Sequence, residues 1–230
     1  MNKTIETIKN HRSIRDFKSD KIEESIINEI IVAAQSMPTS INGQQTSIVV
    51  VQDVKTKATI AEYAGGQPWI DNAPLFLLFV NDFYKTNLAA KKNGETQEIH
   101  ESVEGTVVGT FDSGLSMGAA IIAAESLGLG IVPIGGIRNN PQGMIDLLEL
   151  PEMTFPVAGL AIGYPNSNSR KKPRLPLNTF RHDEKYRTEH LEKEGFVYIE
   201  RMKDGSYEFI KHWKQQQQNW RTCKLWYWRL

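Results

Sequence analysis

The sequence predicts a single domain that combines helices and strands around one apolar helix, followed by a separate tail. The chain has 230 residues, of which 40% are hydrophobic, and a chain of this length can bury roughly 70% of its unfolded surface in one core. The longest apolar stretch, residues 115–127, is interrupted by Ser116, Glu125 and Ser126 alone, which is typical of a central helix packed on several sides. Because it is shorter than the roughly 18 charge-free residues of a membrane span, we expect it in a globular core, with no membrane partner.

The first half of the chain predicts three helices and two strands. We expect helices over residues 4–9, 21–37 and 55–63 and strands over residues 47–51 and 74–81. The second of these helices is amphipathic, with isoleucines at near-helical spacing, and Asp20 and Glu23 are predicted to cap it. Residues 85–104 are charged without a regular period, so we expect a surface excursion there.

The segment after the apolar helix predicts a glycine stop and an edge strand. Gly128 and Gly130 can end the helix, because glycine tolerates the left-handed cap conformation. Residues 131–134 are expected to form a short strand, in which Pro133 suits a strand end or a sheet edge because it cannot donate to a central ladder. The remaining predicted elements are a helix over residues 142–148 and a strand over residues 155–163.

Charge and cysteine content narrow the functional class. Lys and Arg together number 27, as do Asp and Glu, and this balance argues against nucleic acid as a partner, since proteins that bind it usually carry a basic excess. Cys223 is the one cysteine, so no disulfide forms within the chain and a cytoplasmic location is the simplest expectation. The N-terminal residues carry no apolar secretion signal.

Several familiar catalytic motifs are missing from the sequence. It has no His-Glu-x-x-His pattern and no closely spaced pair of cysteines, so we expect no metal site. Gly128 and Gly130 do not begin a Gly-x-Gly-x-x-Gly dinucleotide motif, because Pro133 stands at the third glycine and the segment ends a helix. We do not expect Cys223, in the tail, to act as a nucleophile.

Two basic segments are candidates for binding an anion. His11, Arg12, Ser13 and Arg15 place three potential cations and a hydroxyl within five residues, and a charge-assisted hydrogen bond to phosphate contributes about 1.5–3 kcal/mol. Residues 171–176 hold Lys172 and Arg174 on a stiff, proline-bracketed backbone that loses little freedom on binding. The alternative for each segment is an ordinary solvated basic loop.

Two further segments offer polar and glycine contacts for a ligand. Residues 38–44 follow a helix and contain Ser40, Asn42 and Gln44, whose side chains supply donors and acceptors. Gly135 and Gly136 lack Cβ atoms, so their backbone can lie flat against a planar ligand. The alternatives are a plain polar loop and a plain strand-to-helix turn.

In their order along the chain, these motifs resemble the nitroreductase family, most closely its NADPH-dependent flavin oxidoreductase and oxygen-insensitive nitroreductase branch. The resemblance covers about residues 1–180. It rests on His11-Arg12-Ser13-Ile14-Arg15, Pro38-Thr39-Ser40-x-Asn42-x-Gln44, Gly65-Gly66-Gln67, Ala124-Glu125-Ser126-Leu127-Gly128-Leu129-Gly130, Ile134-Gly135-Gly136-x-Arg138-Asn139 and Lys172-Pro173-Arg174-Leu175-Pro176. Each motif alone is weak, whereas the ordered set is specific.

The resemblance implies an α+β, nitroreductase-like fold with a central mixed β-sheet flanked by helices and a long buried helix at a dimer interface. It implies a homodimer with FMN at the subunit interface, with residues 1–180 as the FMN-binding core and residues 181–230 as a divergent C-terminal arm. The residues implied to bind FMN are His11, Arg12, Ser13, Lys172 and Arg174 at the phosphate, Arg15 and Gln67 at the pyrimidine edge, Ser40, Asn42 and Gln44 in a loop that lines the ring from one subunit or the other, and Ile134, Gly135 and Gly136 behind the ring.

The resemblance also implies a reaction. NADPH, or NADH, would donate a hydride to flavin N5, and nitroaromatics, quinones or free flavin would take the electrons in a ping-pong cycle. We expect no catalytic side chain, because orientation and electrostatics are the protein's share in hydride transfer. Two alternatives stay open: a flavin reductase that supplies reduced FMN to a partner, and a non-catalytic flavin-binding or redox-sensing protein with a defective nicotinamide site.

The tail departs from the family. The resemblance implies a longer helical arm that embraces the partner and carries an arginine-bearing loop for the NADPH phosphate. Residues 181–230 are short for such an arm and end in the aromatic segment NWRTCKLWYWRL, so we expect either a divergent native arm or a truncated or frameshifted end with an exposed apolar patch. By composition alone, the candidate phosphate contacts here are Arg187, Arg201, Lys203 and Arg221.

Overall fold

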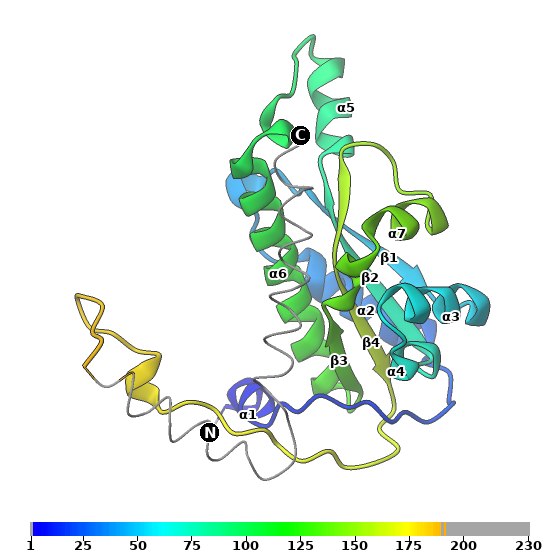
Figure 1. Ribbon diagram of the computed structural model, residues 1–230, viewed down its shortest axis with the longest axis vertical. Helices are drawn as coiled ribbons and strands as arrows, with labels where there is room; N and C mark the ends of the chain where they lie inside the picture. The colour runs from blue at the N-terminus through cyan, green and yellow to red at the C-terminus, as the bar shows by residue number, and fades with distance from the viewer. Residues whose placement is uncertain (1, 190, 192–230) are drawn as a thin grey trace. The chain divides into compact units, whose positions relative to one another are not determined.

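The computed structural model describes residues 2–189 and 191, drawn as a ribbon in Figure 1. The chain divides into two units, Met1–Arg170 and Lys171–Leu230. Helices α1–α7 and strands β1–β4 belong to the first unit, and the short turn η4 (Leu177–Thr179) belongs to the second. The division predicted from the sequence, after residue 180, stays a prediction.

Four antiparallel strands form the centre of the first unit. They lie in the order β1 (Thr46–Val51), β2 (Leu75–Asp82), β4 (Thr154–Gly163) and β3 (Gly130–Ile134). Strand β3 is an edge strand, which confirms the position predicted for Pro133. The expected mixed sheet is antiparallel in all four strands, and the parallel pairing among the described residues is an isolated bridge between Ser13 and Ile131.

Alternate side chains of β2 enter two hydrophobic layers. Every residue of β2 is buried, and burying a large apolar side chain stabilises the fold by about 1.5–3 kcal/mol. Leu75, Leu77 and Phe79 pack with α2 (Glu24–Gln35) and α6 (Val103–Ser126). Phe76, Leu78 and Val80 pack with α3 (Val54–Tyr63), α4 (Pro68–Asp71) and α7 (Pro141–Leu147). Because strand side chains alternate between faces, the result is a three-layer arrangement with α6 on one side of the sheet and α3, α4 and α7 on the other (Figure 1).

Helix α6 is the predicted apolar helix, but it is longer than expected. It begins at Val103, where Ser102 caps it by accepting the Gly105 N–H at 3.0 Å. The sequence signal missed the first turns because their buried face holds small and polar residues, including Gly109 and Asp112. A Cβ on Gly109 would lie 2.1 Å from Asn81 Oδ1, so this glycine allows α6 to approach β2 closely.

The full length of α6 corrects the membrane argument. An 18-residue window of this helix has a mean hydropathy of 1.5, so by length and composition it could cross a membrane. We assign it instead to the core, because it packs against α2 and the sheet and buries Asp112, Ser113 and Ser116. Its other face exposes Val103, Val107 and Phe111, which are 80%, 56% and 65% exposed.

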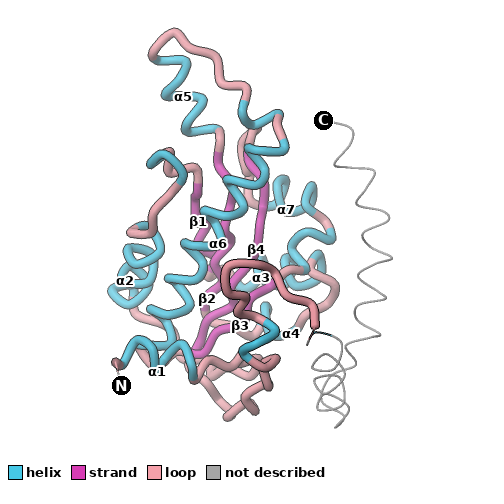
Figure 2. Tube along the Cα trace, turned by 90° about the vertical axis from the view of Figure 1, so that its left-hand side faces the viewer, coloured by secondary structure: helices cyan, strands magenta, loops and turns pink. Residues whose placement is uncertain are grey.

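Other boundaries match the predictions closely, with two corrections. The predicted surface excursion contains a helix, α5 (Tyr84–Lys92), which Figure 2 places at the opposite end of the first unit from α1 (Lys3–Lys9). The predicted Asp20 and Glu23 cap is wrong, because α2 begins at Glu24 and the side chain of its N-cap residue, Glu23, accepts no backbone N–H of the first turn. Gly128 has a φ of +82°, the left-handed conformation expected of the helix stop.

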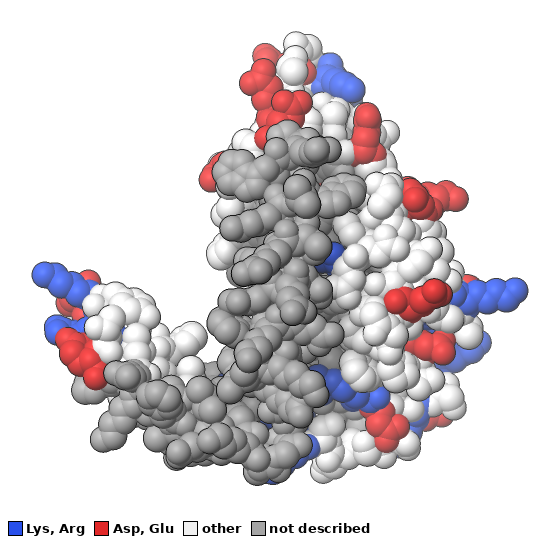
Figure 3. All heavy atoms as spheres, viewed as in Figure 1, with Lys and Arg blue, Asp and Glu red and all other residues white. Residues whose placement is uncertain are grey.

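The surface carries charges of both signs. On the face shown in Figure 3, basic and acidic side chains are interspersed over the first unit, and acidic ones gather at the end that carries α5. Glu95, Glu98, Glu101 and Glu104 are exposed there. The absence of a nucleic-acid partner stays a prediction.

Candidate functional site

The segment that contains the first basic motif is fixed to the edge strand β3. Ser13 forms the isolated bridge to Ile131, and the Ile14 N–H donates to the Ile131 carbonyl oxygen at 2.9 Å. Ile14 is 4% exposed, and a Cβ on Gly130 would lie 2.7 Å from its Cγ1 atom. Burial of Ile14 thus holds Arg12 and Arg15, both exposed, on either side of it at the sheet edge.

His11 pairs with a carboxylate at the end of α6. Its Nδ1 atom lies 2.6 Å from Glu125 Oε1. The contact fixes the imidazole ring and leaves Nε2 available to another group. Glu125 Oε2 is buried and has no hydrogen-bond partner among the described residues. In the sequence, Glu125 is a polar interruption of an apolar helix and a member of the motif from Ala124 to Gly130, but no role at the site was predicted for it.

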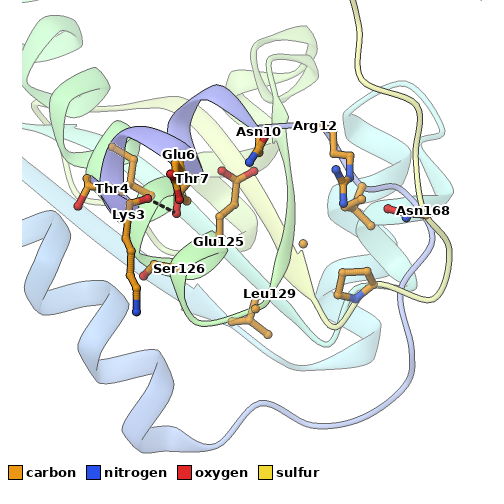
Figure 4. A pocket seen from close by; sticks show the side chains of 15 residues that line it. Lys3, Thr4, Glu6, Thr7, Asn10, Arg12, Glu125, Ser126, Leu129 and Asn168 are labelled. Carbon is orange, nitrogen blue, oxygen red and sulfur yellow. Dashed lines mark hydrogen bonds between the residues drawn. The ribbon is translucent and has the colours of Figure 1, made fainter. Parts of the chain in front are cut away.

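A cavity of about 640 Å³ lies beside this pair. Figure 4 shows Lys3, Thr4 and Thr7 of α1 on one side of it, Arg12 and Asn168 on the other, and Glu125 between them. Arg12 lines this cavity, and its predicted contact with the FMN phosphate stays a prediction.

The glycine turn after β3 meets the loop that contains Gln67. A Cβ on Gly136 would lie 2.4 Å from the Ala64 carbonyl oxygen and 2.6 Å from Gln67 Nε2, so no other residue fits at this position without a backbone shift. Gln67 Nε2 donates to the Ala64 carbonyl oxygen at 2.8 Å. Ile134 is buried behind the turn and Gly135 is exposed.

Arg15 joins the same group of residues. Its guanidinium carbon lies 5.4 Å from the ring centroid of Trp69, two residues beyond Gln67, within the range of a cation–π contact. The structure thereby brings Arg15 and Gln67, predicted for the pyrimidine edge of the flavin, together with Gly136, predicted to lie behind its ring. Trp69 was not predicted, and its position in the Gly65-Gly66-Gln67-Pro68-Trp69 segment was the only signal for it.

The polar loop after α2 adopts an unusual backbone. Ile41, Asn42 and Gln44 have φ angles of 49°, 57° and 53°, in the left-handed region. Residues other than glycine rarely occupy this region, and each such residue costs about 1–3 kcal/mol. Ile41 is β-branched and 98% exposed, so its own packing does not offset this cost. Ser40, Asn42 and Gln44, the predicted ligand contacts, are exposed on the loop.

A buried aspartate of α6 holds this loop. Asp112 is 1% exposed, and its Oδ2 atom accepts the Ser40 N–H at 3.1 Å and the Gln45 side-chain amide at 2.5 Å. Sequence reasoning missed Asp112 and Gln45, because neither belongs to a motif and their pairing spans 67 positions.

The loop and the His11 pair lie far apart within one chain. Asp112 and Glu125 are 13 residues apart on α6, which at 1.5 Å per residue places them about 20 Å apart along its axis. One chain therefore does not bring Ser40, Asn42 and Gln44 to the region of His11 and Arg12.

The second basic motif belongs to the second unit. Arg174 Nη1 donates to the carbonyl oxygens of Lys172 and Pro173 at 3.1 and 3.3 Å. Arg174 is exposed and Lys172 is half-buried. Their predicted phosphate contacts stay a prediction, and Arg201, Lys203 and Arg221 lie outside the described residues. Within residues 2–189 and 191, no group of three His, Cys, Asp or Glu side chains could hold a metal ion.

The sequence and the fold both match known proteins. The chain is 49% identical over 187 residues to the FMN reductase [NAD(P)H] of Bacillus subtilis (strain 168), covering 81% of this chain and 75% of that protein. NfrA2 of B. megaterium has a solved structure with a TM-score of 0.84 and 44% identity, covering 90% of this chain and 86% of that one. The solved complex of NADPH:FMN oxidoreductase from Vibrio harveyi with NAD+ gives a TM-score of 0.85 and 34% identity, covering 94% and 91%. Residues 8–164 match the sequence profile of the Nitroreductase family, and this chain belongs to that family.

Proposed function

We propose that this protein is an FMN-dependent oxidoreductase that transfers a hydride from NADPH or NADH to an acceptor in a ping-pong cycle. The observation that carries the proposal is the meeting of Arg15, Gln67 and the Gly135-Gly136 turn at the end of β3. A flavin needs donors at its pyrimidine edge and a flat surface behind its ring, and these residues supply both chemistries. Two of the relatives named above, the FMN reductase [NAD(P)H] of B. subtilis and the NADPH:FMN oxidoreductase of V. harveyi, are named for FMN and a reduced nicotinamide.

The donor set fits FMN. Arg12, which lines the cavity beside His11, would bind the phosphate by charge-assisted hydrogen bonds, with Lys172 and Arg174 as further cations. Arg15 and Gln67 would donate to the pyrimidine edge, and the amides of Gly135 and Gly136 would lie against the ring. When bound, FMN supplies the two-electron carrier between the nicotinamide and the acceptor.

The chain's own share of the reaction is orientation and charge. Arg15 would place a positive charge where negative charge develops on reduction, which favours the reduced cofactor. The face of the ring opposite Gly135 and Gly136 would be open to the nicotinamide and then to the acceptor. Because an open face makes few specific contacts, quinones, nitroaromatics and free flavin are the proposed acceptors. The name of the B. subtilis relative, an FMN reductase, favours free flavin among them.

The proposed assembly is a homodimer with FMN at its interface. Two observations support it: the exposed apolar side chains Val103, Val107 and Phe111 on α6, and the separation of about 20 Å along α6 between Asp112, which holds the polar loop, and Glu125, which holds His11. A second copy could bring its own loop with Ser40, Asn42 and Gln44 to the first copy's cations. The cytoplasmic location stays a prediction.

The test is an absorbance spectrum of the purified protein, with and without added FMN, followed by anaerobic titration with NADPH and then NADH. We expect flavin bands that bleach in one two-electron step. A protein that takes up no FMN would overturn the proposal. Bound FMN that neither nicotinamide bleaches would overturn the reaction and leave a flavin-binding protein.

A further inference from the structure

We infer that Asp112 is a positioning residue for the flavin: it holds the loop of residues 39–45 in the conformation that presents Ser40, Asn42 and Gln44. The inference rests on the proposed function, in which these three side chains contact FMN. Asp112 itself is 1% exposed, so it acts through the loop and does not touch the ligand.

The loop needs an anchor because its backbone is unfavourable by itself. Three residues other than glycine, Ile41, Asn42 and Gln44, are left-handed within four positions. Strained backbone persists where surrounding contacts over-determine it. The exposed Ile41 side chain makes no such contact within the described chain, as it is 98% exposed.

Asp112 supplies the missing contacts at both ends of the loop. At the start, its Oδ1 and Oδ2 atoms lie 3.3 and 3.1 Å from the Ser40 nitrogen, which donates to them. At the end, Oδ2 accepts from the Gln45 side-chain amide at 2.5 Å. Two smaller contacts support the arrangement: the Gln44 N–H donates to Thr39 Oγ1 at 3.0 Å, and Ser113 Oγ lies 3.4 Å from Thr46 Oγ1.

Gly43 gives the Gln45 amide the room to reach Asp112. A Cβ at residue 43 would lie 2.3 Å from Gln45 Oε1. Gly43 has ordinary helical backbone angles, φ −70° and ψ −21°. Position 43 therefore requires glycine because of the contact with Gln45, and not because of its backbone conformation.

The pairing is specific to a carboxylate facing an amide. Every recorded partner of Asp112 in the described chain is an N–H donor, so the two oxygens act only as acceptors. In either orientation, an asparagine at 112 would turn its NH2 group toward an N–H donor, the Ser40 N–H at the Oδ1 position or the Gln45 NH2 and Ser40 N–H at the Oδ2 position. Asparagine at 112 together with glutamate at 45 exchanges the amide and the carboxylate between the two positions. The NH2 group at 112 can then donate to the carboxylate at 45, which restores the hydrogen bond.

This exchange gives the experiment. FMN dissociation constants are measured by flavin fluorescence quenching for wild type, Asp112→Asn, Gln45→Glu and the double variant, each checked for folding by circular dichroism melting of the protein without FMN. Asp146→Asn is the matched control, because Asp146 also accepts from a glutamine amide, that of Gln142 at 2.8 Å, on the exposed side of α7 and outside the proposed site. We expect each single variant to bind FMN at least about tenfold more weakly, the double variant to recover to within about threefold of wild type, and the control to match wild type.

A role in stability alone would lower the melting temperatures and leave the FMN affinity of the folded protein unchanged, and that result overturns the inference. Single variants that bind like wild type, or a double variant no better than the weaker single, overturn it as well. Should the single variants fail to fold, Gly43→Ala displaces the Gln45 amide without altering the buried carboxylate, and an unchanged FMN affinity in that variant overturns the inference. Wild-type protein that takes up no FMN overturns the proposed function, and this inference with it.

Discussion

His11 and Glu125 are 114 positions apart in the sequence, and their side chains meet at 2.6 Å between Nδ1 and Oε1. The contact joins the basic N-terminal motif to the end of the central helix. It orients the imidazole beside the cavity that Arg12 and Glu125 both line, so Glu125 helps to shape the proposed phosphate site.

Replacement of Glu125 tests this orientation. We expect Glu125→Ala to weaken FMN binding by about tenfold, because a hydrogen bond to a charged group contributes about 1.5–3 kcal/mol. Glu125→Gln should lose less, since its amide oxygen can still accept from the imidazole. Fluorescence titration with FMN measures both, and Glu29→Ala, on the exposed side of α2, is the control. An alanine variant with wild-type affinity would refute the assignment.

The second basic motif can be tested by one double variant. Lys172→Ala with Arg174→Ala removes two cations, so FMN affinity should fall by at least about tenfold, as measured by equilibrium dialysis. Lys185→Ala removes an exposed lysine from the same unit and should have no effect. Unchanged affinity in the folded double variant would remove both residues from the site.

The apolar face of α6 predicts a dimer that a single charge disrupts. Phe111 is 65% exposed, and Phe111→Glu should convert a dimer to a monomer, because a buried unpaired carboxylate at an interface is strongly unfavourable. Light scattering after size-exclusion chromatography measures the molecular mass of the variant. We expect its affinity for FMN to fall when the dimer is lost. Val54→Glu, at a position that is 66% exposed on α3, should remain dimeric. A dimer that tolerates Phe111→Glu would place the interface elsewhere.

Lys57 predicts a stability that increases at alkaline pH. Burial lowers the pKa of Lys57 below 10.5, although the charges of Asp71 and Asp53 partly oppose this, and its ammonium donates to the Ala73 carbonyl oxygen. Between the folded pKa and 10.5 the unfolded chain binds more protons, so the free energy of unfolding rises with pH. Relative to Lys57→Met, wild type should therefore gain stability as the pH rises from neutral towards 10.5. Denaturant melts at several pH values measure this difference, with Lys55→Met on the exposed face of the same helix as the control. A difference that does not change with pH would contradict the prediction.

Much of the architecture could be predicted because its signals are local. The family resemblance and the α+β class are confirmed. The apolar strand β2, the edge position of Pro133 and the helix stop at Gly128 each follow from neighbouring residues or from one residue's own backbone. The start of α6 was missed because the local signal is absent there: its first turns bury glycine and polar residues, which carry no hydrophobic period.

The candidate site was predicted less completely. Arg15, Gln67 and Gly136 could be named from motifs, and the structure brings them together. Trp69, Asp112 and Gln45 could not be named in this way. Trp69 contacts Arg15 and Asp112 bonds to Gln45, and the partners of both contacts are far apart in the sequence.

The sequence by itself determined which residues carry cations, donors and flexible backbone, and where helices and strands run, because these properties depend on a residue and its near neighbours. Only the tertiary structure decided that Asp112 anchors Ser40 and Gln45, that Glu125 orients His11, and that these two places lie about 20 Å apart along α6. The physical reason is burial, because a polar group removed from water needs a hydrogen-bond partner. Which partner it meets depends on how the whole chain packs, and the neighbouring sequence does not decide it.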